Sequence, residues 1–319
     1  MTESDSSAMI ERVAVIGAGL MGHGIALEFA VGGRQVAITD ASAAALEQGL
    51  ANMRRGAATL ANLELAPRGA CDTALQRVAA CATLAEAVAG ADLVIEAVSE
   101  NLPLKQRVFA ELDRACGPEV VLASNTSTFM PSALAAGARH GERILVAHYF
   151  NPPHLLPVVE IVPHAGTAAE VVARVRTLYE ALGKRPVVLR REIAGFIANR
   201  LQQALLREAA ALVESGVASA ADVDAVVSGS FGRRLAVAGP FEVSDLAGLD
   251  VIAAIARELW PGLAAGGIAD LLAAPAAAGH YGAKTGRGFG DWPPARVDAA
   301  KARIATALAA IATLPGTEG

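Results

Sequence analysis

The 319-residue sequence predicts an α/β fold in which a doubly wound, mostly parallel sheet is followed by an all-helical C-terminal domain. Two observations support this prediction. Short β-branched runs alternate with helical or loop segments up to about residue 190, which is typical of a parallel sheet covered by helices. Beyond that point the pattern indicates successive helices with capping residues and breakers.

The expected elements follow in chain order. A strand at 12–16, a helix through Ala30 and a strand at 35–39 form one βαβ unit. Further strands are expected at 92–98, 119–123, 143–147, 158–162 and 186–189. Ser219, just before ADVDAVV, is expected to begin a helix. We therefore expect a polar tail at 1–10, a first domain at 11–190 and a helical domain at 191–319.

The composition narrows the class of protein. The net charge is −5 and there is no basic block, so nucleic acid is not an expected partner. No uncharged apolar run reaches the ~18 residues of a membrane span, and MTESDSSAMI lacks the pattern of a secretory signal. The three cysteines match no zinc or redox spacing, and the histidines outside the site proposed below show no metal-ligand spacing. We expect a cytoplasmic protein with reduced thiols and no catalytic metal.

A glycine-rich turn follows the first strand and precedes a helix, as in a Rossmann-type dinucleotide site. Its G-x-G-x-x-G pattern allows the tight turn, the approach of a pyrophosphate and close packing of helix on strand. An aspartate at the end of the second strand would bind the adenosine ribose and repel a 2′-phosphate, which favours NAD over NADP. The alternative is a structural turn with a solvated aspartate. The expected cofactor contacts are Gly17, Gly19, Leu20, Met21, Gly22 and Asp40.

Several separate motifs together resemble the 3-hydroxyacyl-CoA dehydrogenase family over nearly the whole chain. The resemblance implies an NAD-binding domain, a helical domain that forms a homodimer, and a catalytic His–Glu pair. The motifs are GAGLMGHGIA, IEAVSENLPLK, SNTST, HYFNP, VVEIV, GFIANRL, GPFEVSDLAGLD and KTGRGFGDW.

The stretch AHYFNPPHLLPVVEIV, residues 147–162, holds the implied catalytic pair. His148 would be the general base for the substrate hydroxyl, because imidazole titrates near neutral pH. Glu160 would fix the tautomer of the ring and favour the imidazolium. Asn151-Pro152-Pro153 would turn the chain so that the two strand ends meet. A buried structural pair is the alternative.

Further positions match functional residues of the family. The Ser127 hydroxyl and the Asn199 amide could hold the substrate oxygen, although each could instead make a local cap. For Glu96, Asn101 and Lys105 the resemblance implies contact with the nicotinamide half of the cofactor. The alternative there is a helix-start asparagine and a solvated lysine.

The sequence leaves the substrate open between two classes. HYFNP and KTGRGF resemble the hydroxybutyryl-CoA enzymes, whereas MPSAL and the double proline resemble relatives that act on free hydroxy acids such as gulonate or carnitine. Residues 41–104 contain no lysine, but four arginines could meet the phosphates of CoA: Arg54, Arg55, Arg68 and Arg77. We lean to a short-chain 3-hydroxyacyl-CoA, with a free 3-hydroxy acid as the alternative. A non-catalytic NAD-binding structural or sensor protein is the third possibility.

Overall fold

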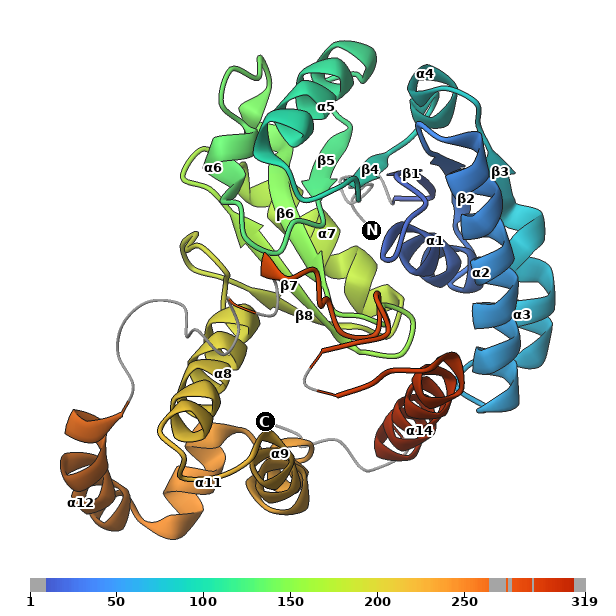
Figure 1. Ribbon diagram of the computed structural model, residues 1–319. Coiled ribbons are helices and arrows are strands. Elements are labelled where there is room, and N and C mark those ends of the chain that lie inside the picture. The colour runs from blue at the N-terminus through green and yellow to red at the C-terminus, as the bar shows by residue number, and fades with distance from the viewer. Residues whose placement is uncertain (1–9, 264–273, 275–276, 289, 313–319) are drawn as a thin grey trace. The chain divides into compact units, whose positions relative to one another are not determined.

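The structure, a computed structural model, describes residues 10–263, 274, 277–288 and 290–312, in two compact units (Figure 1). The first unit ends at Asn199 and the second begins at Arg200. Helix α8 (Ala198–Glu214) starts in the first unit and continues in the second.

The first unit is built on an eight-stranded sheet with the order β3-β2-β1-β4-β5-β6-β7-β8. All neighbouring strands are parallel except β6 and β7, which confirms the predicted mostly parallel sheet. Strand β3 has only three residues, VAA, and was not among the expected strands. The strands are β1 (Arg12–Ile16), β2 (Gln35–Thr39), β3 (Val78–Ala80), β4 (Leu93–Glu96), β5 (Val121–Ser124), β6 (Ile144–Tyr149), β7 (Val158–Pro163) and β8 (Arg185–Val188).

Helices cover both faces of this sheet, and each face has its own hydrophobic core. On one face, buried side chains of α1, α2, α3 and α7 pack on the sheet. On the other face, α4, α5 and α6 do the same. The α-helices of this unit are α1 (Gly22–Val31), α2 (Ala43–Asn62), α3 (Arg68–Ala74), α4 (Leu84–Val88), α5 (Leu102–Ala115), α6 (Pro131–Leu134) and α7 (Ala169–Ala181), with 3₁₀ turns at Leu75–Arg77 and Gly141–Arg143.

Polar caps set where several helices begin. The Ser42 side chain accepts a hydrogen bond from Ala45 N at the start of α2, and Asn101 accepts one from Leu104 N at the start of α5. At the predicted cap Ser219, the side chains of Ser219 and Asp222 satisfy each other's backbone N–H groups in a capping box. These bonds supply acceptors to N–H groups that lack helical partners.

Most described residues of the second unit lie in helices, as predicted, but few of their side chains are buried. Only Ala210 and Ala309 are buried among those whose exposure is defined. No helix in the described part of the chain is long and apolar enough to cross a bilayer. Besides α8, the helices are α9 (Ala220–Gly229), α10 (Phe231–Leu235), α11 (Pro240–Ala247), α12 (Leu249–Leu259) and α14 (Pro294–Ala312), with a 3₁₀ turn at Trp260–Gly262.

The close packing of α2 on the glycine-rich turn gives a first prediction. A Cβ on Gly49 would lie 2.7 Å from Ala18 O, and the backbone there cannot move away cheaply. We expect Gly49→Ala to lower the free energy of unfolding by roughly 1–3 kcal/mol through overpacking, and calorimetry would show this as a lower melting temperature.

Gly69→Ala in helix α3 is the matched control for this substitution. A Cβ on Gly69 would meet no atom within 4 Å. The alanine should therefore leave the stability unchanged or raise it by up to about 1 kcal/mol through helix propensity. Equal melting temperatures for the two variants would contradict the close contact between Gly49 and Ala18.

Candidate active site

The glycine-rich turn between β1 and α1 has the geometry that a dinucleotide requires. Gly17 has a φ of +105°, which favours glycine. A Cβ on Gly22 would lie 1.8 Å from Gly17 O, so any side chain there would displace helix α1. A Cβ on Gly19 would meet nothing within 4 Å, which leaves the backbone open to an approaching pyrophosphate.

Asp40, at the end of β2, ties this turn to the start of α2. Its carboxylate accepts hydrogen bonds from Ala18 N at 2.8 Å and Ser42 N at 3.0 Å. Leu20 is 66% exposed and Met21 is half-buried, and no side chain in the described residues caps the first turn of α1. The positive end of the α1 dipole thus faces the open turn, so these residues fit the predicted NAD.

The structure brings His148 and Glu160 together across the antiparallel pair of β6 and β7. The two residues are directly opposite in the register, and His148 Nδ1 lies 2.7 Å from Glu160 Oε2. Both side chains are buried. Because a carboxylate accepts hydrogen bonds, Nδ1 is the donor, and in the neutral ring the lone pair is then on Nε2. The ring therefore has the tautomer that a general base needs at Nε2.

The second oxygen of Glu160 is held by the start of helix α8. Glu160 Oε1 accepts hydrogen bonds from Ile197 N at 2.9 Å and Ala198 N at 3.1 Å. The chain reaches this point through Phe196, whose φ is +52°, an unusual value for a bulky residue. The buried Phe196 ring lies 5.4 Å from the His148 ring, centre to centre. Two backbone N–H groups thus fix one oxygen of Glu160, and its other oxygen orients the histidine.

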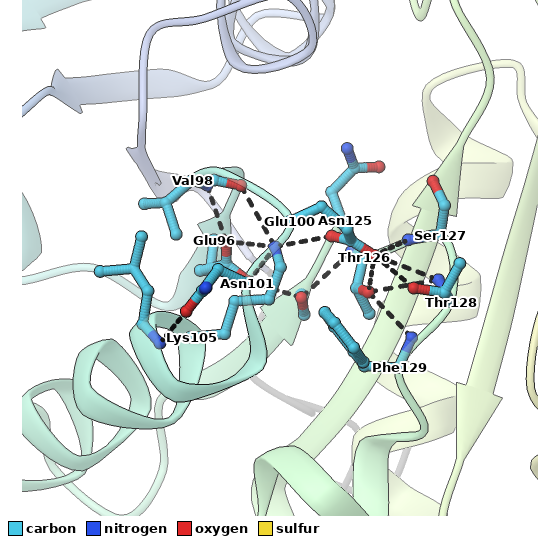
Figure 2. A network of polar contacts seen from close by, with 12 residues as sticks. Glu96, Val98, Glu100, Asn101, Lys105, Asn125, Thr126, Ser127, Thr128 and Phe129 are labelled. Carbon is cyan, nitrogen blue, oxygen red and sulfur yellow. Dashed lines mark hydrogen bonds and ion pairs between the residues drawn. The ribbon is translucent and has the colours of Figure 1, made fainter. Parts of the chain in front are cut away.

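A second buried carboxylate, Glu96 at the end of β4, anchors the neighbouring part of the sheet edge (Figure 2). Lys105 Nζ donates to both of its oxygens, at 2.8 and 3.1 Å. Val98 N and Ser124 Oγ also donate to it. Glu96 is 0% exposed and Lys105 is 1% exposed, so Lys105 is not the solvated lysine that the sequence allowed. Contact of either side chain with a cofactor stays a prediction.

Glu100, which sequence reasoning missed, holds the segment after β5. Its Oε1 accepts hydrogen bonds from the hydroxyls of Thr126 and Thr128 and from the backbone N–H of Ser127 and Thr128 (Figure 2). Its Oε2 lies 3.3 Å from Lys105 Nζ. Burial acts to raise the pKa of Glu100, but the threonine hydrogen bonds and Lys105 outweigh it and lower the pKa below its ordinary value. The glutamate therefore stays ionised and fixes this loop.

Ser127 and Asn199 are also brought together. Asn199 Nδ2 donates to Ser127 O at 2.9 Å, and both residues are half-buried. Asn101, by contrast, caps α5 with its side-chain oxygen and is exposed. The signal for Glu100 was present in SENLPLK, directly before this cap, but its partners in SNTST lie 26 to 28 residues away.

The family models match both parts of the chain. The NAD binding domain of 3-hydroxyacyl-CoA dehydrogenase matches residues 12–193. The C-terminal domain of the same family matches residues 195–292. These matches confirm the predicted resemblance and the NAD cofactor.

One relative spans nearly the whole chain. It is the 5-formyl-3-hydroxy-2-methylpyridine 4-carboxylate 5-dehydrogenase of Mesorhizobium japonicum, 36% identical over 95% of this chain and 97% of its own. A solved structure of an enzyme of that name, described as an NAD⁺-dependent dismutase, has a TM-score of 0.90 and 35% identity, with coverage of 95% and 98%. The similarity therefore extends through both units.

Two other relatives are named for different substrates. An L-carnitine dehydrogenase from Oceanobacillus iheyensis is 38% identical over 75% of this chain and 76% of its own. The solved (S)-3-hydroxybutyryl-CoA dehydrogenase of Ralstonia eutropha has a TM-score of 0.72 and 31% identity, with coverage of 89% and 99%. Since the models match both domains and the first relative matches nearly end to end, the chain belongs to the 3-hydroxyacyl-CoA dehydrogenase family.

Proposed function

We propose that this NAD-dependent oxidoreductase interconverts a hydroxyl and a carbonyl on a small free carboxylic acid, with His148 as the general base. The observation that carries the proposal is the buried hydrogen bond of 2.7 Å between His148 Nδ1 and Glu160 Oε2. NAD supplies the acceptor for the hydride that leaves the carbinol carbon.

The chain's own residues handle the proton of the substrate. His148 Nε2 takes the hydroxyl proton as the carbonyl forms, and returns it in the reverse direction. Glu160 offsets the charge that the ring gains, while Ile197 N and Ala198 N keep Glu160 in place. Because the ring is already in the required tautomer, little reorganisation is needed when the proton moves.

Ser127 and Asn199 are proposed to hold the reacting oxygen. Asn199 Nδ2 donates one hydrogen bond to Ser127 O, which leaves its second N–H for another acceptor. Glu100 fixes the Ser127 backbone N–H, so the serine hydroxyl projects from an ordered loop. Two donors near one oxygen would favour the carbonyl form and orient it toward His148.

A free acid is the substrate class that the full-length relative favours. That relative is named for a pyridine carboxylate and matches 95% of this chain. Two of the four arginines considered for CoA make contacts within their own segments, Arg55 with Asn52 and Arg77 with Thr73. A short-chain 3-hydroxyacyl-CoA is the second candidate, supported by KTGRGF and by the similarity to the hydroxybutyryl-CoA enzyme.

A homodimer is proposed from the apolar surface of the second unit. Phe241 is 85% exposed, Leu246 is 81% exposed and Trp260 is 71% exposed. Because only two side chains of this unit are buried among those described, its helices lack the core that normally stabilises a domain. A second copy of the same helices would supply matching apolar surface.

The catalytic assignment is tested by His148→Gln. We expect this variant to bind NADH normally and to lose about 10²–10⁴-fold in kcat, because no general base remains. His140→Gln, which changes a partly exposed histidine paired with Glu142, should keep wild-type turnover. Near-normal kcat for His148→Gln would overturn the role of His148.

The substrate class is tested by initial rates of NADH formation. We expect kcat/KM for the better of free 3-hydroxybutyrate and L-carnitine to exceed that for 3-hydroxybutyryl-CoA by at least about 10-fold, or ~1.4 kcal/mol. A higher value for the CoA ester would support the second candidate instead. Failure of all these compounds and of gulonate would exclude small 3-hydroxy acids and their CoA esters as substrates.

The dimer is tested by the double variant Phe241→Glu/Leu246→Glu. Buried glutamates without partners should break an apolar interface. The molar mass measured by light scattering should therefore fall from twice that of the chain to that of a single chain. Val187→Glu on the edge strand β8, where the valine is 39% exposed, is the control and should remain dimeric. A wild-type protein at the chain mass would contradict the dimer.

A further inference from the structure

Another buried ion pair links α1, the helix after the glycine-rich turn, to the chain that joins His148 to Glu160. Lys184 stands in the turn between α7 and β8, and its Nζ lies 2.6 Å from Glu28 Oε2 on α1. The Lys184 and Glu28 side chains are 8% and 7% exposed. None of the roles proposed above uses this pair.

The ammonium of Lys184 also holds the connection between β6 and β7. Its Nζ donates to Pro153 O at 2.7 Å and to Leu156 O at 2.9 Å. The ammonium thus combines two hydrogen bonds to backbone carbonyls with its ion pair to Glu28. One buried cation therefore fixes two points of the segment 150–157, which begins two residues after His148 and ends three before Glu160.

Burial of this ion pair costs free energy, and the effect of burial is seen in the pKa of Glu28. Burial raises the pKa of Glu28 to about 7, although Lys184 acts in the opposite direction. Apolar residues of similar volume could pack α1 on this segment without removing two charges from water. They could not, however, bind two backbone carbonyls.

The face of β6 opposite His148 packs on α7, the helix that precedes Lys184. Tyr149 follows His148 in β6 and so points to the other side of the sheet, where it meets Tyr179 of α7 edge-to-face at 5.6 Å. The β6–β7 connection and the back of β6 are thus both held from α7 and the turn after it. A displacement of Lys184 would therefore also displace the ends of β6 and β7, which carry His148 and Glu160.

From these contacts we infer that Lys184 is a positioning residue, which holds the β6–β7 connection so that His148 and Glu160 meet in register, with Glu28 as its counterion. The inference rests on the proposed function for its effect on turnover. Its effect on the His148–Glu160 hydrogen bond does not depend on any substrate.

The test compares Lys184→Met with the double variant Glu28→Leu/Lys184→Met. The single variant leaves Glu28 buried without a partner and should lower the melting temperature. The double variant removes both charges and should recover part of that loss, while the carbonyls of Pro153 and Leu156 stay without their donor. If Lys184 positions the pair, both variants should keep NADH affinity and lose about 10- to 100-fold in kcat, measured at about pH 8.

A proton NMR measurement tests the positioning role of Lys184 without relying on the proposed function. The proton on His148 Nδ1, bound to Glu160 at 2.7 Å, should give a downfield proton resonance that is absent in His148→Gln. We expect it to shift or broaden in the double variant. Arg176→Met, which breaks an exposed pair with Glu180 on α7, should leave the resonance, kcat and melting temperature unchanged.

The outcomes are distinct. A double variant with wild-type kcat and an unshifted His148 resonance would overturn the positioning role and leave a structural one. Normal turnover in His148→Gln would instead remove the proposed function, while the resonance would still decide whether Lys184 holds the pair together.

Discussion

The buried carboxylate of Glu160 is the constraint on which the site depends. A buried carboxylate needs donors, and this one receives them from His148 and from two backbone N–H groups at the start of α8. Those three donors come from two separate segments of the first unit, the strand β6 and the start of α8. Satisfying one charge therefore fixes the tautomer of His148, the unusual backbone at Phe196 and the beginning of α8 together.

Glu96 plays an equivalent part at the ends of β4 and β5. Lys105 lies between Glu96 and Glu100, and Glu100 in turn binds the loop that carries Ser127 (Figure 2). The expected cofactor side and the expected substrate side of the sheet edge are thereby connected through charge-assisted hydrogen bonds. Such bonds hold a loop more tightly than apolar packing, which has no direction.

The two units differ in how they are stabilised. The first has a hydrophobic core on each face of its sheet. In the second, the described helices bury Ala210 and Ala309 and expose many large apolar side chains. Since helices of this length are stabilised mainly by packing of their apolar faces, these exposed side chains support the proposed dimer.

Local sequence by itself determined the sheet class, the glycine-rich turn, the cap at Ser219 and, through motif resemblance, the family. Periodicity, capping and turn chemistry act within a few residues, so the sequence displays them directly. Strand β3 was missed because three residues, VAA, carry too little pattern. Only the tertiary structure decided that Lys105 is buried against Glu96, that Glu100 holds the Ser127 loop and that Lys184 meets Glu28. These contacts join residues distant in sequence, and the burial that gives each charge its partner exists only after the sheet has formed.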